Sequence, residues 1–167
     1  MFPFIVISLV QFCEATVIQD CSQNRTIEIR NQKVDVHVLL KDLREADNCG
    51  KLTAIILTNV SLRELPSDLF SGLHHVRTVR LDHNLLTHID SHLFAGLPSL
   101  STLSVSNNNI SNVSSLHLPR LLASIDFSAN KISNSENKIF SASSTFQVNY
   151  AELHANSFVN ISRRSKC

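Results

Sequence analysis

Apolar residues recur along most of this chain with a period of about two dozen residues. The segment LFSGL at 69–73 returns 24 positions later as LFAGL at 93–97. Early in each period, two apolar residues alternate with polar ones, which is the pattern of a short strand with one buried face. These periods begin at Leu52, Val76, Leu100, Leu122 and Val148. The pattern therefore predicts about five stacked repeats over residues 52–161, each opening with a short strand.

Asparagine occupies the ninth position of most periods. An amide side chain both donates and accepts hydrogen bonds, so it can satisfy backbone groups where the chain leaves a strand and turns inward. In the first period Val60 stands in this place, and the backbone there must find another partner. The predicted asparagine ladder consists of Asn84, Asn108, Asn130 and Asn156.

Together these positions form the pattern L-x-x-L-x-L-x-x-N-x-L, and over residues 52–161 the chain resembles the leucine-rich repeat family. The tail L-P-x-x-x-F-x-x-L, present at 65–73, is similar to that of secreted and receptor-ectodomain members. The resemblance implies an α/β solenoid shaped as a horseshoe arc. A parallel sheet then lines its concave side, and irregular or short-helical segments form its convex side. A row of residues at position nineteen then fills the outer core: Phe70, Phe94, Leu118 and Phe140.

Residues 16–51 are expected to form an N-terminal cap. Alternating valines at 34, 36 and 38 predict a strand, and residues 39–47 a short helix. Cys21 and Cys49 bracket this unit, and a disulfide between them stabilises the fold by about 3.6 kcal/mol on the chain-entropy model. A zinc site formed by both cysteines and a histidine is an alternative, but the disulfide explains them more simply.

The N-terminus predicts secretion. Residues 1–12 are apolar and uncharged, and Cys13-Glu14-Ala15 places small residues where signal peptidase cleaves, so we expect residues 1–15 to be a signal peptide. A short N-terminal core strand is the alternative. No later stretch approaches the roughly 18 apolar residues of a membrane span. Five N-glycosylation sequons then become candidate glycan sites, none of them at strand positions three, five or seven: Asn24, Asn59, Asn109, Asn112 and Asn160.

The C-terminal residues 162–167 form a polar tail that is too short to cover the last repeat. A solenoid exposes the core of its last turn unless a cap covers it. Two arrangements follow: a dimer formed through Cys167 or the uncapped edge, or a chain that is the N-terminal fragment of a larger receptor ectodomain.

Composition argues against several classes of chemistry. Three glycines cannot build a glycine-rich phosphate loop, and 15 basic against 14 acidic residues leave no electrostatic footprint for nucleic acid. The eight histidines follow no metal-ligand pattern, and no nucleophile elbow is present. We therefore expect no enzyme, no cofactor and no metal site.

A recognition module fits these observations better. We expect a protein ligand on the concave face of the sheet, where side chains project at fixed spacing. The alternative is a structural spacer of the extracellular matrix. Ligand contacts are expected at or beside strand positions three, five and seven: Arg77, Arg80, Asp82, His83, Asp126, Tyr150, Glu152 and His154.

Overall fold

The computed structural model describes residues 25–47, 50, 52–111, 113, 116–132 and 150–152, the last three by their backbone alone. Several predictions fall outside these residues and are not addressed by the structure. They are the signal peptide 1–15, the tail 162–167, the cysteines Cys21, Cys49 and Cys167, the sequons Asn24, Asn112 and Asn160, the ladder member Asn156, Phe140, and the side chains of Tyr150, Glu152 and His154.

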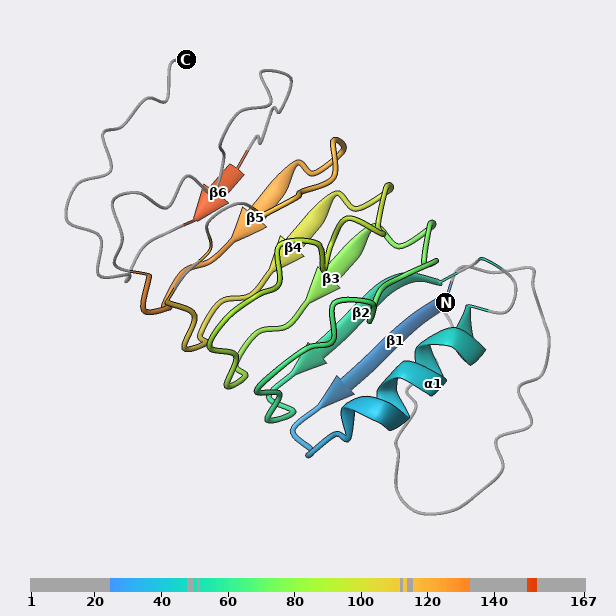
Figure 1. The fold of residues 1–167 in the computed structure, drawn as a ribbon, viewed down its shortest axis with the longest axis horizontal. Coiled ribbons are helices and arrows are strands. Elements are labelled where there is room, and N and C mark those ends of the chain that lie inside the picture. Colours follow the sequence, from blue (N-terminus) through green and yellow to red (C-terminus); the bar gives the residue numbers. More distant parts are fainter. Residues whose placement is uncertain are drawn as a thin grey trace, which may run out of the picture.

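Six strands form one parallel sheet whose spatial order is the order of the sequence (Figure 1). The register aligns equivalent repeat positions, so that Ile55 pairs with Val79, Val79 with Leu103 and Leu103 with Ile125. Each turn therefore stacks on its neighbour, and the described chain is a parallel-strand solenoid. The strands are β1 (Arg25–Arg30), β2 (Leu52–Thr58), β3 (Thr78–Arg80), β4 (Thr102–Ser104), β5 (Ser124–Asp126) and β6 (Tyr150–Glu152).

The core lies behind the sheet, on the side to which strand positions four and six point. Val79 and Leu81, the members from the second repeat, are fully buried. Farther from the sheet, the rings of Phe70 and Phe94 stack with centroids 6.0 Å apart, and Leu118 packs half-buried against the same core. Each such side chain contributes about 1.5–3 kcal/mol by leaving water. The periodic apolar positions therefore build one continuous core.

The cap differs from the prediction in its secondary structure. The expected strand at 34–38 is wrong, because helix α1 (Val36–Ala46) begins there. The side chain of Asp35 caps it by accepting a 2.8 Å hydrogen bond from the His37 amide. Leu39 and Leu43, one helical turn apart, are both fully buried. The helix forms because these two leucines are buried at helical spacing and Asp35 caps its first turn. These contributions outweigh the short alternation of valines.

The strand that the cap contributes lies earlier, at β1. It pairs with β2 in parallel, with Ile27 opposite Ile55 and Ile29 opposite Leu57. Both isoleucines are buried and occupy positions four and six of an additional turn. The sheet therefore begins before the first predicted repeat, and α1 lies beside β1 (Figure 1).

The segments that return from one strand to the next contain turns rather than further α-helices wherever the structure describes them. Within the same residues, no helix has the length and apolar character needed to cross a membrane.

Candidate interaction surface

Strand positions three, five and seven share the side of the sheet opposite the core, and we call this side the sheet face. Register places Glu28, Ile56, Arg80, Ser104 and Asp126 in one row across it, at position five of successive turns. Neighbouring strands lie about 4.8 Å apart, so the row presents side chains at a fixed spacing.

An asparagine ladder holds the turns together on the inner side. Asn84, Asn108 and Asn130 are buried and make the same set of contacts. The Asn108 amide donates to the Leu81 carbonyl of the preceding turn at 3.0 Å, and to two carbonyls of its own turn. Its oxygen accepts from the Leu86 amide at 3.1 Å. Each asparagine therefore satisfies backbone groups of two successive turns, which fixes one turn against the next.

The first repeat lacks this asparagine, and the Val60 amide at the same position adds a contact to Asn84 of the next turn, beside the Leu62 contact that corresponds to that of Leu86 with Asn108. The amide groups of both Val60 and Leu62 donate to the Asn84 oxygen at 3.1 Å. Ser61, which lies between them, has φ of 62°. The Val60 side chain is fully buried and joins the core.

A second ladder of backbone bonds follows at position eight, where the chain is left-handed in every described turn. In the first four of these turns the position-eight amide donates to the position-seven carbonyl of the next turn, as His83 does to Ser106 at 3.0 Å. A left-handed backbone is tolerated best by asparagine among residues with a side chain, and His83, which takes this conformation one residue after Asp82, is exposed. The residues are Asn31, Asn59, His83, Asn107 and Ala129, with φ between 51° and 57°.

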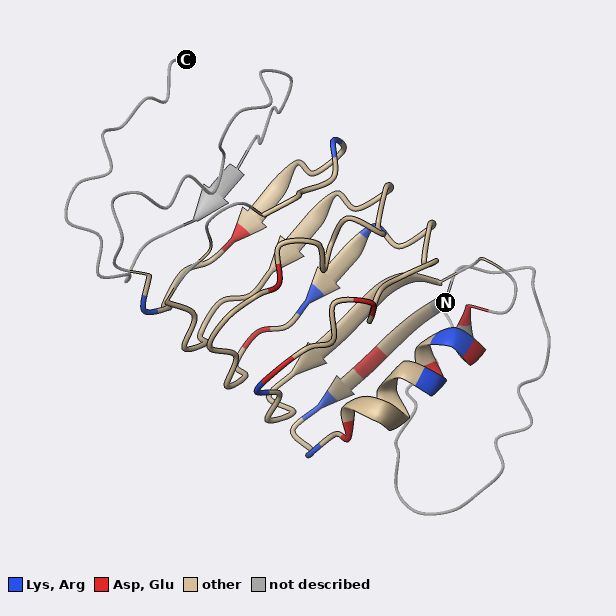
Figure 2. Ribbon diagram, viewed as in Figure 1, with Lys and Arg blue, Asp and Glu red and all other residues tan. Residues whose placement is uncertain are grey.

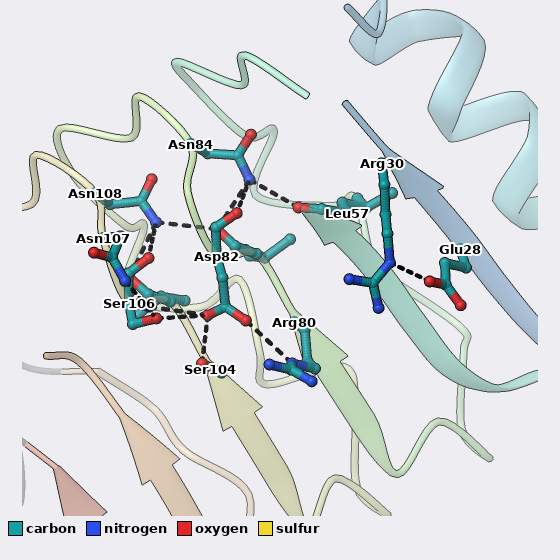
Figure 3. A network of polar contacts seen from close by, with 12 residues as sticks. Glu28, Arg30, Leu57, Arg80, Asp82, Asn84, Ser104, Ser106, Asn107 and Asn108 are labelled. Carbon is teal, nitrogen blue, oxygen red and sulfur yellow. Dashed lines mark hydrogen bonds and ion pairs between the residues drawn. The ribbon is translucent and has the colours of Figure 1, made fainter. Parts of the chain in front are cut away.

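Asp82 is buried, so the expectation that it faces solvent is wrong. Only 3% of its surface is exposed, because side chains of the neighbouring turn cover its carboxylate. One oxygen accepts from the hydroxyls of Ser104 and Ser106 and from the Ser106 amide (Figure 3). The other accepts from the Arg80 Nε at 3.1 Å. Asp82 therefore braces the sheet face from within.

Arg80 lies where the sequence places it, on the sheet face, with half of its side chain exposed. Sequence reasoning missed a second arginine of the same kind. Arg30 ends β1, pairs with Thr58 in register, and is held through its Nε by Glu28 (Figure 3). The signal that identifies it is the T-I-E-I-R alternation at 26–30, which precedes the valines taken for the cap strand.

The remaining predicted contacts are spread from β3 to β6. Arg77 is exposed just before β3, and Asp126 is half-buried on β5, where it accepts from the Ser128 amide at 2.8 Å. Glu152 occupies position five of β6, opposite Asp126. Figure 2 shows basic residues of the sheet on β1 and β3, and acidic ones on β1 and β5. The structure thus does not gather the predicted residues into one cluster.

Both described sequons follow strands, Asn59 directly after β2 and Asn109 five residues after β4. Asn59 is exposed, and its amide nitrogen, the atom to which a glycan is attached, donates to the Asn31 oxygen at 2.9 Å. Asn109 is half-buried. Both lie outside the rows of positions three, five and seven.

Two histidines meet on the returning segments. The rings of His92 and His117 stack with centroids 4.4 Å apart, although 25 residues separate them in sequence. Within the described part of the chain, no group of three or more histidine, cysteine or acidic side chains has a geometry that could hold a metal ion. This stack is a contact between neighbouring turns.

One carboxyl group of the cap has a raised pKa. Asp42 of α1 is half-buried, and among the described residues its Oδ2 atom is buried without a hydrogen-bond partner. Burial raises the pKa of this carboxyl above its usual 3.8, with a further contribution from Glu45, while Lys41 opposes the rise.

Comparison with protein families agrees with this architecture. Residues 50–110 match the family model described as Leucine rich repeat. This match supports a leucine-rich repeat protein. The parallel-strand solenoid, of about four turns, fits that fold, and the repeat supports a protein-interaction module in general. The family is typically non-enzymatic. Among curated proteins, none matches the chain.

Proposed function

We propose that the chain is an extracellular recognition module that binds a protein partner on its sheet face, the concave face of a horseshoe-shaped repeat. One observation carries this proposal. Arg80 is half exposed at the middle of the sheet, yet its guanidinium is held in place by the buried carboxylate of Asp82. A charged side chain that is both exposed and fixed binds a partner with little loss of rotamer entropy.

The surroundings of Arg80 support the same function. Thr78 and Thr102, its neighbours at position three, are half-buried and short, so they leave the face open to a partner. The asparagine ladder fixes the strands against one another, which makes this surface a rigid platform. Arginine is among the residue types that dominate interface energetics.

The test compares variants on the two sides of the solenoid. The full chain is screened against an array of recombinant extracellular domains, and each hit is measured with Arg80→Glu, Thr102→Arg and Arg120→Glu. Arg120 is an exposed arginine in the turn before β5, away from the sheet face, and serves as the control. We expect the first two variants to weaken binding by about 1–3 kcal/mol, the cost of a substantial interface contact, and the control to have no effect. Equal binding by all three contradicts the proposal.

Secretion is the compartment we propose, and the apolar N-terminus and the five sequons support it. Mass spectrometry of material secreted from eukaryotic cells is expected to find Thr16 as the N-terminus and a glycan on Asn59 or Asn160. An intact Met1 with no glycan contradicts it.

In an oxidising compartment Cys21 pairs with Cys49, which leaves Cys167 for a partner molecule. Non-reducing electrophoresis with peptide mapping tests this pairing. We expect a Cys21–Cys49 linked peptide and a dimer through Cys167. Free thiols at all three positions contradict the pairing.

A further inference from the structure

Two arginines on the sheet face are built in the same way, one on each side of β2. Arg30 lies on β1 and Arg80 on β3, and each side chain is about half exposed. Each is bound through Nε by a carboxylate two residues away in its own turn, Glu28 within β1 or Asp82 just after β3. In Figure 3 both guanidinium groups lie between these two carboxylates. The two ion pairs therefore flank β2 in opposite order, with Arg30 in the row of Thr58 and Arg80 in the row of Ile56.

The outer donors of both arginines remain available. A guanidinium carries five N–H donors, and the structure uses only the Nε group of each, because neither Nη has a partner among the described residues. The Asp82 oxygens are already occupied by serine hydroxyls, an amide and Arg80. These carboxylates therefore fix the arginine planes without covering the donors at their ends.

The surface between the arginines is uncharged and mainly apolar, with Thr58 as its one hydroxyl at position seven of β2. Ile56 stands at position five of β2 and Ala54 at position three, both half-buried, and β2 has no charged residue at all. Since β1 and β3 are separated by two strand spacings, about 10 Å, one short peptide segment spans the whole pattern. A partner therefore meets the hydrogen-bond donors of Arg30 and Arg80, with the apolar side chains of Ala54 and Ile56 between them.

We propose that this site binds an acidic segment of a protein partner. A glutamate or aspartate carboxylate accepts hydrogen bonds from the Nη groups of Arg30 or Arg80, and an adjacent apolar side chain packs on Ile56. The proposal rests on the proposed function and names the chemistry of the partner. Guanidinium and carboxylate groups match in plane and charge, and such charge-assisted bonds are the stronger class.

The net charge of the site favours a single carboxylate over a polyanion as its ligand. Glu28 and Asp82 balance Arg30 and Arg80, so the four groups carry no net formal charge. Nucleic acids and sulfated glycans bind chiefly through accumulated positive charge. A single carboxylate instead binds through directed hydrogen bonds from the Nη groups, because Glu28 and Asp82 fix the guanidinium planes.

The experiment selects random peptides displayed on phage against the full chain. The same selection is run on Arg30→Gln, Arg80→Gln, Arg80→Lys and Arg120→Gln, all checked for folding by circular dichroism. We expect peptides selected on the unaltered chain to be enriched in an acidic residue beside an apolar one, with the same enrichment on Arg120→Gln. The enrichment is expected to fall on Arg30→Gln and on Arg80→Gln, and to fall on Arg80→Lys as well, because a lysine lacks the planar fork.

The best selected peptide is then resynthesised with its acidic residue changed to the amide. We expect this change to weaken binding about tenfold, as loss of a charge-assisted hydrogen bond predicts. On whichever of Arg30→Gln and Arg80→Gln removes the guanidinium that binds this peptide, the acidic and amide peptides are expected to bind alike. Peptides without acidic enrichment, or no selected peptide, overturn the proposal.

Thr102→Arg separates failure of this site from failure of the proposed function. If neutral peptides are selected and lose binding to Thr102→Arg, the sheet face binds proteins but the acidic preference is wrong. If no selected peptide responds to Thr102→Arg or to the arginine variants, both proposals fail. Tighter binding of a sulfated oligosaccharide through Arg30 and Arg80 also overturns the acidic peptide as occupant.

Discussion

Asn108 and Asp82 lie in neighbouring turns and are about equally buried, yet their side chains bind different kinds of group. Asn108 binds backbone atoms, namely three carbonyls and one amide. Asp82 binds mainly side chains, the hydroxyls of Ser104 and Ser106 and the guanidinium of Arg80. Backbone partners are present in every turn, whereas these side chains are present only where the sequence supplies them.

This difference explains why one network repeats and the other occurs once. Asn84 and Asn130 reproduce the contacts of Asn108 in their own turns. At position seven, where Asp82 stands, the neighbouring turns carry Thr58 and Ser106 instead. The ladder therefore stabilises the fold, while the Asp82 network gives one part of the sheet face its own chemistry.

The largest effect is expected when the ladder is broken in the middle. Asn108→Ala leaves the Leu86 amide and several carbonyls without the amide side chain, so we expect the free energy of unfolding to fall by about 3–5 kcal/mol. Urea denaturation measures it. Asn109→Ala, one residue on and half-buried, is the control and should cost less than about 0.5 kcal/mol. Equal losses from the two variants contradict the ladder's role.

A smaller loss is expected from the network that occurs once. Asp82→Ala removes the partner of two hydroxyls, an amide and Arg80, and we expect it to cost about 2 kcal/mol. The comparison is Asp126→Ala, in which a half-buried carboxylate loses a single bond to the Ser128 amide. That change should cost about 0.5–1 kcal/mol. A smaller loss for Asp82→Ala than for Asp126→Ala rejects the bracing role.

The first turn allows the ladder to be extended rather than broken. Val60→Asn restores the ladder residue at the cost of a buried apolar side chain. We expect a net loss of about 1 kcal/mol, because new contacts to the carbonyls of β1 and β2 offset part of the lost burial. Thermal or urea unfolding measures it beside Asn108→Val, which should cost several times more. If the two reciprocal changes cost the same, position nine has no special role.

The smallest effect concerns a buried oxygen that belongs to neither network. The raised pKa of Asp42 means that the folded chain holds this proton more tightly than the unfolded chain, so stability falls as pH rises above about 4. Asp42→Asn should therefore stabilise the protein at neutral pH, by less than about 1 kcal/mol since the group is only half-buried. The gain should vanish below about pH 3. A gain that is unchanged at low pH argues against this cause.

The periodic part of the molecule can be predicted from the sequence because the same pattern of apolar residues recurs in every repeat. Val79, Leu103 and Ile125 pair in the register that their spacing predicts. The valine alternation at 34–38 occurs once, and there the N-cap Asp35 and buried leucines decide in favour of a helix. Single patterns of three residues do not outweigh helical burial.

The candidate site is predicted less completely, because periodicity assigns a face but not a partner. Position seven placed Asp82 on the sheet face, yet its burial depends on the two serines of the next turn that bind it. Arg30 was missed because β1 precedes the first recognised repeat. A contact that two side chains of neighbouring turns make only once cannot be predicted from the repeat pattern.

The central claim is that the sheet face contacts the partner and the returning segments do not. Methyl NMR on the full chain, titrated with a partner protein identified by the array screen, tests this claim most directly. We expect the methyl signals of Ile56, Thr78 and Thr102 to shift, while those of Ala95 and Leu121, exposed on the returning segments, stay in place. Shifts confined to Ala95 and Leu121, with the three sheet-face methyls unchanged, contradict the account.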